Sequence, residues 1–297
     1  MQKNNLEIIA EIANSHQGDV NLALKIAKDA VDSGANAIKF QMYFAEEFVT
    51  YNHPRFLHFK KQSFNIQDWR KIFDNVKKLN TKIYCDIFGE KALDLAEKYN
   101  LDGYKIHSSD MNNIILLEKI KKIKKNKKIF LSAGGSTLRE IGKALATLNK
   151  KKKDTFLLYG FQNYPTKVND LNMNNIIFLK KYFGNYSRIG YMDHTSPNNK
   201  LNYYLPIFSI KLGAEIIEKH ITYDRSKKGV DYHSSLNPDE FKKFIEIIKK
   251  NKPINQNINN LLKKTLGKNY YYLTNKEIIY RNESKKSWVA ANNLKPG

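Results

Sequence analysis

The sequence predicts an α/β fold of the (β/α)8 barrel class. Two hydrophobic periodicities alternate along the first 250 residues: short apolar runs typical of buried strands, and amphipathic segments typical of helices. Eight such pairs in about 250 residues match the usual size of this barrel. Doubly wound sheets usually have about five to seven strands, and no G-x-G-x-x-G motif opens a helix in this sequence. The barrel is therefore the preferred prediction.

Each predicted strand is a mostly apolar run with β-branched or aromatic members. The eight strands are residues 6–13, 37–41, 82–87, 103–108, 128–133, 155–160, 188–193 and 215–222. The helices that follow them are residues 21–33, 68–79, 90–99, 113–125, 137–148, 171–183, 202–212 and 238–250. Asp68 is predicted to be the N-cap of its helix, because a carboxylate accepts hydrogen bonds from the free N–H groups of a first turn.

The composition excludes several classes of protein. Hydrophobic residues make up 41% of the 297 residues and aromatic residues 12%, which is enough for a packed core. No apolar run is long enough to span a bilayer, so no membrane partner is expected. The N-terminus shows no signal peptide, and the single cysteine, Cys85, cannot form an internal disulfide. We therefore expect a protein of the reducing cytoplasm.

The chain is strongly basic. Lysine and arginine total 51 against 29 acidic residues, which gives a formal net charge of +22. Much of this charge lies in lysine blocks such as residues 121–128 and 150–153, without interleaved aromatic residues or a nucleic-acid-binding motif. We interpret the blocks as solvated helix faces, so nucleic acid is not an expected partner. A polyanion-binding role is the alternative, and salt-sensitive binding would be its signature.

Polar residues recur at the C-terminal end of each predicted strand. In a barrel these ends and the loops after them carry the chemistry. The residues are Glu11, Asn14, His16, Lys39, Gln41, Asp86, Lys105, Ser108, Asp110, Ser132, Gln162, Tyr164, Asp193, His194, Glu218, His220 and, further along, Asp231. The pattern predicts a polar pocket with lysines, carboxylates and histidines.

Lys39 and Lys105 lie within otherwise apolar strands. A lysine there needs an anionic partner, because burial of an unpaired ammonium group is costly. The partner is either a phosphate or carboxylate group of a substrate, or a structural network with Glu11, Asp86 or Asp110. The presence of two such lysines favours the substrate.

His194 and His220 end adjacent predicted strands. Neighbouring strands lie about 4.8 Å apart, so the two imidazoles can converge on one divalent metal. Two histidines with water and substrate oxygens suit Mn²⁺, Fe²⁺, Co²⁺ or Zn²⁺ better than Mg²⁺. Glu218 shares a face with His220 and could support the metal or bind substrate. Hydrogen-bonded structural histidines are the alternative.

The remaining histidines and the cysteine have simpler interpretations. His16 could cap the entry to the first helix rather than take part in the site. His53, His58 and His107 are not expected to be catalytic. Cys85 is expected to pack against a helix.

Eight motifs together resemble the sialic acid synthase family. In order they are EIANSHQGD, AIKFQMYFAEEFVT, GYKIHSSDMNN, IFLSAGG, NYPTKVNDLNM, GYMDHTS, GAEIIEKHITYDR and DYHSSLNPDEF, and they extend over about 250 residues. The tail SWVAANNLKPG is similar to the start of the antifreeze-like (SAF) domain that follows the barrel in that family.

The resemblance implies condensation of phosphoenolpyruvate with an N-acetylated hexosamine to give a nonulosonic acid and phosphate. It implies that His194 and His220 bind a divalent metal, usually Mn²⁺ with Mg²⁺ or Co²⁺ as alternatives, which activates the open-chain aldehyde of the sugar. It assigns to the phosphoenolpyruvate anions Lys39, Lys105, Ser108, Ser132 and Tyr164. It assigns to the sugar or the reacting centre Glu11, Gln41, Glu218 and Asp231, and the base for water addition falls at Asp110.

Four residues depart from the family pattern. Asp110 stands where glutamate is usual, and Gln162 stands where asparagine is usual. Met192 replaces a hydroxyl residue. Asp86 replaces a threonine that meets the phosphate, and its carboxylate would repel a dianion unless it is protonated or paired with a lysine.

The resemblance also divides the chain. Residues 1–252 are the expected catalytic barrel, 253–281 a linker, and 282–297 the truncated beginning of the antifreeze-like domain. In the family this domain docks on the partner subunit's barrel, so a homodimer is expected. The predicted function is a nonulosonic acid synthase; the alternatives are a related phosphoenolpyruvate-dependent synthase that uses an aldose phosphate, and a degenerate barrel that serves as a binding subunit.

Overall fold

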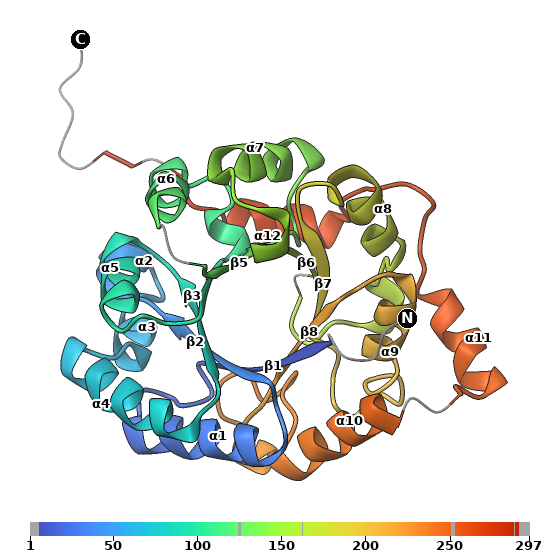
Figure 1. Ribbon diagram of the computed structural model, residues 1–297, viewed down its shortest axis with the longest axis horizontal. Helices are drawn as coiled ribbons and strands as arrows, with labels where there is room; N and C mark the ends of the chain where they lie inside the picture. Colours follow the sequence, from blue (N-terminus) through green and yellow to red (C-terminus); the bar gives the residue numbers. More distant parts are fainter. Residues whose placement is uncertain (1–5, 124–125, 162, 251–252, 288, 291–297) are drawn as a thin grey trace.

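The computed structural model describes residues 6–123, 126–161, 163–250, 253–287 and 289–290, and it confirms the barrel prediction. Eight parallel strands form one closed sheet in sequential order (Figure 1). They are β1 (Glu7–Ala13), β2 (Ala37–Met42), β3 (Lys82–Ile87), β4 (Gly103–Ile106), β5 (Lys128–Ser132), β6 (Thr155–Tyr159), β7 (Arg188–Asp193) and β8 (Ile216–His220).

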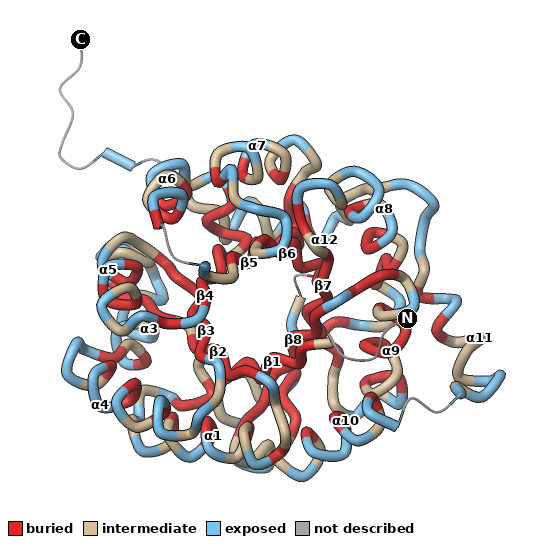
Figure 2. Tube along the Cα trace, viewed as in Figure 1, coloured by how far each residue is buried: buried red, intermediate tan, exposed pale blue. Residues whose placement is uncertain are grey.

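Helices surround the barrel and cover its outer face (Figure 2). The outer ring consists of α1 (Val20–Asp32), α4 (Ile66–Val76), α5 (Glu90–Lys98), α6 (Ile114–Lys122), α7 (Leu138–Leu148), α8 (Asn174–Phe183), α9 (Leu205–Leu212) and α10 (Pro238–Lys250). Two short helices, α2 (Ala45–Phe48) and α3 (Phe56–Gln62), interrupt the connection from β2 to α4. Within the described residues, no helix has the length and apolarity that a bilayer crossing requires.

The start of α4 corrects one prediction. Asn65, and not Asp68, is the N-cap: its side chain accepts hydrogen bonds from the N–H groups of Gln67 and Asp68. Asp68 instead occupies the third helical position, and its carboxylate accepts from the N–H of Asn65 at 3.2 Å. The two residues form a reciprocal capping box, in which either one resembles a cap when the sequence alone is considered.

The segment after the barrel contains two more helices, α11 (Gln256–Lys264) and α12 (Asn275–Ser284). A capping box of Thr274 and Glu277 begins α12. This helix lies against the barrel near β5 and β6 (Figure 1). Most of the predicted linker is therefore helical, whereas the division into domains stays a prediction.

The interior of the barrel is filled in layers, because every second residue of each strand points inward. On β1 the inward residues are Glu7, Ile9 and Glu11, which lie in the floor, the middle and the mouth of the barrel. The middle layer is an apolar cluster of Ile9, Ala37, Tyr84, Phe130, Phe156, Leu158, Met192 and Ile216. Gly190 keeps space for this cluster, since a Cβ there would lie only 2.3 Å from Ile216.

Glu7 organises the floor of the barrel. Its carboxylate forms ion pairs with Lys82 and Lys128 and accepts a hydrogen bond from the Tyr84 hydroxyl. Burial alone would raise the pKa of Glu7, but the hydrogen bonds from Lys128 and Tyr84 and the lysine charges hold it below 4.5. The ionised carboxylate therefore stabilises the folded state.

We expect Glu7→Gln to lower the free energy of unfolding by about 2 kcal/mol at pH 7, because it leaves the lysines without their counter-charge. Because the pKa of Glu7 is lower in the folded than in the unfolded state, the additional stability of the wild type is present above the pKa of the unfolded state. It is lost as the pH falls through the pKa of the folded state. Urea unfolding at pH 7 and pH 3 measures both effects. The control is Glu246→Gln, which breaks an exposed pair with Lys250; an equal effect of the two substitutions would contradict the prediction.

Candidate functional site

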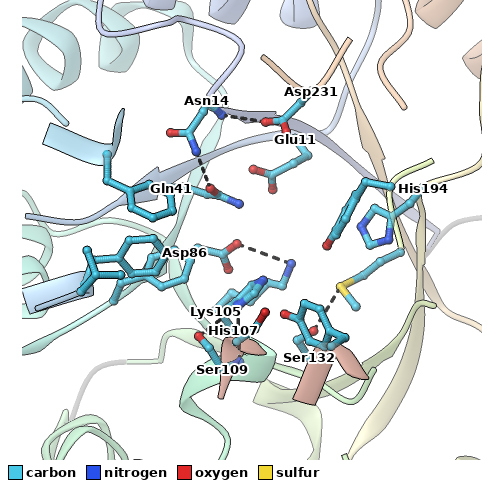
Figure 3. A pocket seen from close by; sticks show the side chains of 18 of the residues that line it. Glu11, Asn14, Gln41, Asp86, Lys105, His107, Ser109, Ser132, His194 and Asp231 are labelled. Carbon is cyan, nitrogen blue, oxygen red and sulfur yellow. Dashed lines mark hydrogen bonds and ion pairs between the residues drawn. The ribbon is translucent and has the colours of Figure 1, made fainter. Parts of the chain in front are cut away.

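A cavity of about 390 Å³ opens at the C-terminal ends of the strands, within the usual size range of ligand pockets. Figure 3 shows polar side chains from several strands pointing toward its centre. Of the residues predicted from the sequence, those that line it are Glu11, Asn14, Gln41, Asp86, Lys105, Ser132, Tyr164, His194, Glu218, His220 and Asp231.

Strand register brings these side chains together. Glu11 of β1 is paired with Lys39 of β2 on one side and with His220 of β8 on the other. Asp86 of β3 is paired in the same way with Gln41 and with Lys105 of β4. Residues paired across parallel strands point to the same face of the sheet. The inward-facing residues are apolar in the middle of the strands and polar at their C-terminal ends, so together they form a polar layer at the mouth.

Two lysines and three carboxylates form a buried ion cluster in this layer. The ammonium group of Lys39 directly contacts the carboxyl group of Glu11 and lies 2.8 Å from Asp86 and 3.6 Å from Glu218. That of Lys105 lies 2.6 Å from Glu218 and 3.6 Å from Asp86. Both lysines are thus paired with carboxyl groups of the chain itself, which agrees with the alternative of a structural network. The network was expected to include Glu11, Asp86 or Asp110; the structure has Glu218 in place of Asp110.

The cluster contains three carboxyl groups but only two ammonium groups. Burial raises the pKa of Glu11 to about 8; Lys39 opposes this shift, while Glu218 and Asp86 reinforce it. Burial would also raise the pKa of Glu218, but the charges of Lys105 and Lys39 hold it at about 2. At neutral pH the additional proton therefore resides on Glu11, and the cluster is close to electrically neutral.

His194 and His220 lie side by side at the cavity wall, with ring centroids 5.3 Å apart. The Tyr164 ring lies 4.4 Å from that of His194. Burial lowers the pKa of His194 to about 4 and that of His220 well below 6.5, so both imidazoles are neutral. Nδ1 of His194 lies 3.1 Å from the carbonyl oxygen of Phe161. A carbonyl only accepts, so Nδ1 carries the proton and Nε2 keeps its lone pair.

This donor set fits a divalent metal that has other ligands besides protein. Nδ1 of His220 is buried and has no hydrogen-bond partner in the part of the chain that the structure describes. Neutral imidazoles with available lone pairs are metal ligands. Across the same described residues, no group of three histidine, cysteine or acidic side chains could hold an ion by itself. The remaining ligands would therefore be water or substrate oxygens.

Three predicted site residues lie behind the cavity wall. Lys39 is fully buried beneath the mouth. Ser108 is buried, and its hydroxyl lies 2.7 Å from the hydroxyl of Tyr280. The Asp110 carboxylate accepts hydrogen bonds from Ser109 at 3.0 Å and Asn113 at 2.8 Å. Gln162 lies outside the described residues.

The structure adds residues that the sequence did not predict for the site. His53 and His107, which were expected to be non-catalytic, line the cavity, as do the aromatic side chains of Phe48, Phe59 and Phe88. The segment after the barrel contributes Tyr280, Glu283, Ser284 and Lys286. The sequence does carry one signal for this segment: the Thr274–Glu277 capping box, which marks the start of a helix.

A closed barrel whose mouth holds paired lysines, buried carboxylates and neighbouring histidines is an architecture typical of barrel enzymes. The NeuB family model matches residues 26–259, and the chain belongs to this family. The resemblance found in the sequence motifs is confirmed.

Known relatives agree with this assignment. The N,N'-diacetyllegionaminic acid synthase of Campylobacter jejuni is 31% identical over 307 residues, which cover 98% of this chain and 86% of that protein. An uncharacterized protein of Methanocaldococcus jannaschii is 33% identical over 98% of this chain and 80% of its own length. The crystal structure of an N-acetylneuraminic acid synthetase from Leptospira borgpetersenii, in complex with citrate, superposes with a TM-score of 0.74 and 32% identity, covering 94% of this chain and 92% of that one.

His16 is buried but does not line the cavity. Its Nδ1 accepts a hydrogen bond from the N–H of Gly18 at 3.0 Å, and its ring lies 4.3 Å from that of Phe64. Burial lowers the pKa of His16 from 6.5 to about 3. Between pH 6.5 and pH 3 the imidazole of His16 binds a proton in the unfolded chain but not in the folded chain. The contribution of His16 to the free energy of unfolding is therefore complete above pH 6.5 and falls as the solution is acidified.

We expect His16→Gln to reduce the pH dependence of the unfolding free energy between pH 6 and pH 4 by about 1.4 kcal/mol per pH unit. Urea unfolding across this range measures the slope. The matched control is His233→Gln, because the His233 side chain is exposed. An unchanged slope in His16→Gln would show that another group is responsible for the acid sensitivity.

Proposed function

We propose that this protein condenses phosphoenolpyruvate with an N-acetylated hexosamine, forming a nonulosonic acid and releasing phosphate. Its family includes synthases of sialic, legionaminic and pseudaminic acids, which supports carbon–carbon bond formation as the reaction class. The observation that carries the proposal is the convergence of a histidine pair and a lysine–carboxylate cluster on one cavity.

In the proposed reaction, C3 of phosphoenolpyruvate forms a bond to the aldehyde carbon of the open-chain sugar. Positive charge then develops at C2, where water adds and gives one proton to a carboxylate of the cavity. The bond between C2 and the phosphate oxygen then breaks, the second proton of the water leaves with the phosphate, and the keto group of the product remains. Lys105 is suited to hold an anionic oxygen of phosphoenolpyruvate, because its ammonium group is at the cavity. The ionised Glu218 is suited to stabilise the positive charge at C2.

Glu11 is suited to supply the proton that the aldehyde oxygen requires. Its pKa of about 8 keeps it protonated at neutral pH, and it lines the cavity. Gln41 and Asp231 are suited to bind the sugar, since the Asn14 side chain donates to Gln41 and the Asn14 N–H donates to Asp231, each at 3.2 Å (Figure 3). These hydrogen bonds fix both acceptors on one side of the cavity.

His194 and His220 are proposed to hold a divalent ion, with Mn²⁺ preferred over Mg²⁺ or Co²⁺. When bound there, the ion would supply Lewis-acid polarisation of the sugar aldehyde. The hydrogen bond from His194 to the Phe161 carbonyl fixes the ring orientation that presents Nε2.

The test is phosphate release from phosphoenolpyruvate with Mn²⁺ and a panel of N-acetylated hexosamines. We expect release that depends on the sugar, that a chelator abolishes, and that His220→Ala lowers at least about 100-fold through loss of a ligand. His233→Ala is the matched control and should retain activity, because this side chain is exposed. Absence of release with every sugar would contradict the proposal and favour the interpretation as a binding subunit.

A second prediction concerns Asp86, whose carboxylate lies beside both buried lysines. We expect Asp86→Thr to lower the KM for phosphoenolpyruvate about tenfold, because it removes a negative charge that competes with the substrate for these ammonium groups. Steady-state kinetics with varied phosphoenolpyruvate measures the change. Asp231→Asn is the comparison, since within the described residues Asp231 interacts with Asn14 and forms no ion pair with Lys39 or Lys105; its KM for phosphoenolpyruvate should not fall. A higher KM in Asp86→Thr would mean that Asp86 aids binding.

A further inference from the structure

Another cavity opens at the opposite end of the barrel, where the strands begin. This floor cavity has a volume of about 310 Å³, at the lower end of the range usual for ligand pockets. Among the described residues, the charged ones that line it are Glu7, Lys82, Lys128, Arg188 and Glu215. Phe156 and Ile216 of the apolar middle layer line it as well, so this layer separates the floor cavity from the mouth.

Four of the charged side chains form the floor layer of the barrel. Glu7, Lys82, Lys128 and Arg188 come from β1, β3, β5 and β7, the strands that alternate around the closed sheet (Figure 1). Each lies two positions before an inward-facing residue of its own strand, so each points inward as well. Alternate strands supply the side chains of one layer in barrels of this kind. The floor layer therefore combines three cationic groups with one carboxylate.

The carboxylate of Glu7 does not balance the three cations. Lys128 forms an ion pair with it, and the ammonium group of Lys82 lies 3.4 Å away. Arg188 pairs instead with Glu215, through Nε at 2.9 Å. The side chain of Glu215 is 44% exposed, so water screens much of its charge. Among the described residues that line the floor cavity, three positive charges thus stand against two negative ones.

The ring of Phe156 holds two of the cations beside the floor cavity. The guanidinium carbon of Arg188 lies 4.7 Å from the ring centroid, and the ammonium group of Lys128 lies 5.3 Å from it. An aromatic face attracts a cation without neutralising its charge. Both side chains are only about one quarter exposed, which limits the screening of their charges by water. Arg188 and Lys128 can therefore still attract an anion.

The cations of the floor layer also repel one another. Burial lowers the pKa of Lys128 from its usual value; the carboxylate of Glu7 opposes this shift, whereas the charges of Lys82 and Arg188 reinforce it. An anion between the three cationic groups would relieve the repulsion and favour the charged form of Lys128. The layer is thus prepared electrostatically for a negatively charged ligand.

Arg188 has hydrogen-bond donors that a ligand can use. A guanidinium group carries five N–H donors, and within the described residues only Nε has a hydrogen-bond partner, the carboxylate of Glu215. The terminal N–H groups can bind two oxygens of one phosphate through parallel hydrogen bonds. The two lysines approach the same cavity from other strands. Donors that converge from three directions fit the tetrahedral oxygens of a phosphate better than a planar carboxylate.

We propose that the floor cavity is a binding site for a phosphate group, which Arg188, Lys128 and Lys82 hold between them. The ligand is a small dianionic oxyanion, either inorganic phosphate or the phosphate of a monoester. This site lies at the opposite end of the barrel from the mouth and does not depend on the function proposed above. A ligand bound there stabilises the folded chain, because the unfolded chain does not bring the three cations together.

The first test maps the site on the full wild-type chain. Lysines are acylated at constant ionic strength, with inorganic phosphate or with chloride, and the labelled positions are identified by mass spectrometry. We expect phosphate to protect Lys82 and Lys128 and to leave Lys25 unchanged. Lys25 is the matched control, because it is an exposed lysine of α1 that lies 2.6 Å from Asp29. Equal labelling of Lys82 and Lys128 in phosphate and in chloride would overturn the inference.

The second test breaks the Arg188–Glu215 ion pair from each side in turn. We expect Arg188→Gln to raise the phosphate concentration for half-maximal protection of Lys82 about tenfold, because it removes a cation that holds the anion. Glu215→Gln should lower this concentration about threefold, because it removes a competing negative charge and releases Arg188 to the ligand. Both variants lose the same ion pair, so a purely structural role would shift both in the same direction. Shifts of the same sign would therefore contradict the proposal.

Further titrations of Lys82 protection identify the source of the phosphate group. Tighter protection by inorganic phosphate would identify the free ion as the ligand, and tighter protection by glycerol phosphate or a hexose phosphate would identify a monoester; either result supports the site. Equal protection by acetate would reveal a positive field without selectivity for phosphate and would overturn the inference. If Arg188→Gln does not fold, Glu215→Gln and the wild-type titrations still decide, because the side chain of Glu215 is exposed. Turnover is not needed for any of these measurements, so their outcome is separate from that of the proposed function.

Discussion

The buried pairing of Lys39 with Glu11, Asp86 and Glu218 is the interaction on which the rest of the site depends. An unpaired ammonium group at this depth would be too costly to keep charged, so the lysine requires carboxylates on neighbouring strands. The carboxylates in turn require the lysine. This mutual dependence fixes side-chain positions on β1, β2, β3 and β8 before any ligand binds, which limits the reorganisation that binding would cost.

The cluster also explains how departures from the family pattern can be accommodated. Asp86 places a third carboxyl group in a buried layer, and in the same layer burial raises the pKa of Glu11 to about 8, so that Glu11 keeps its proton at neutral pH. On the opposite wall, the Met192 sulfur lies 3.7 Å from the Ser132 hydroxyl, so a thioether stands where the sequence motif led us to expect a hydroxyl residue. Close pairing of ammonium and carboxyl groups thus keeps strong local fields within the buried ion cluster.

The barrel and most of its mouth could be predicted because both follow from local patterns. Alternating strand residues such as Ile9 and Glu11 indicate which side chains point inward, and the closed topology brings the strand ends together. The contribution of Lys286 could not be predicted, because it depends on long-range docking of α12 through Glu140 and Gly135. The position of Asp110 behind the wall likewise depends on a short turn whose geometry no periodicity encodes.

The apolar middle layer has a consequence for how this barrel can diverge. Inward residues of floor and mouth are four positions apart along β1, which corresponds to roughly 13 Å of strand. Hydrocarbon and aromatic groups fill the space between them. Side chains at the mouth can therefore be exchanged during evolution without breaking the ion pairs and the hydrogen bond that Glu7 makes in the floor. One end of the molecule is free to acquire new substrate preferences while the other preserves the architecture.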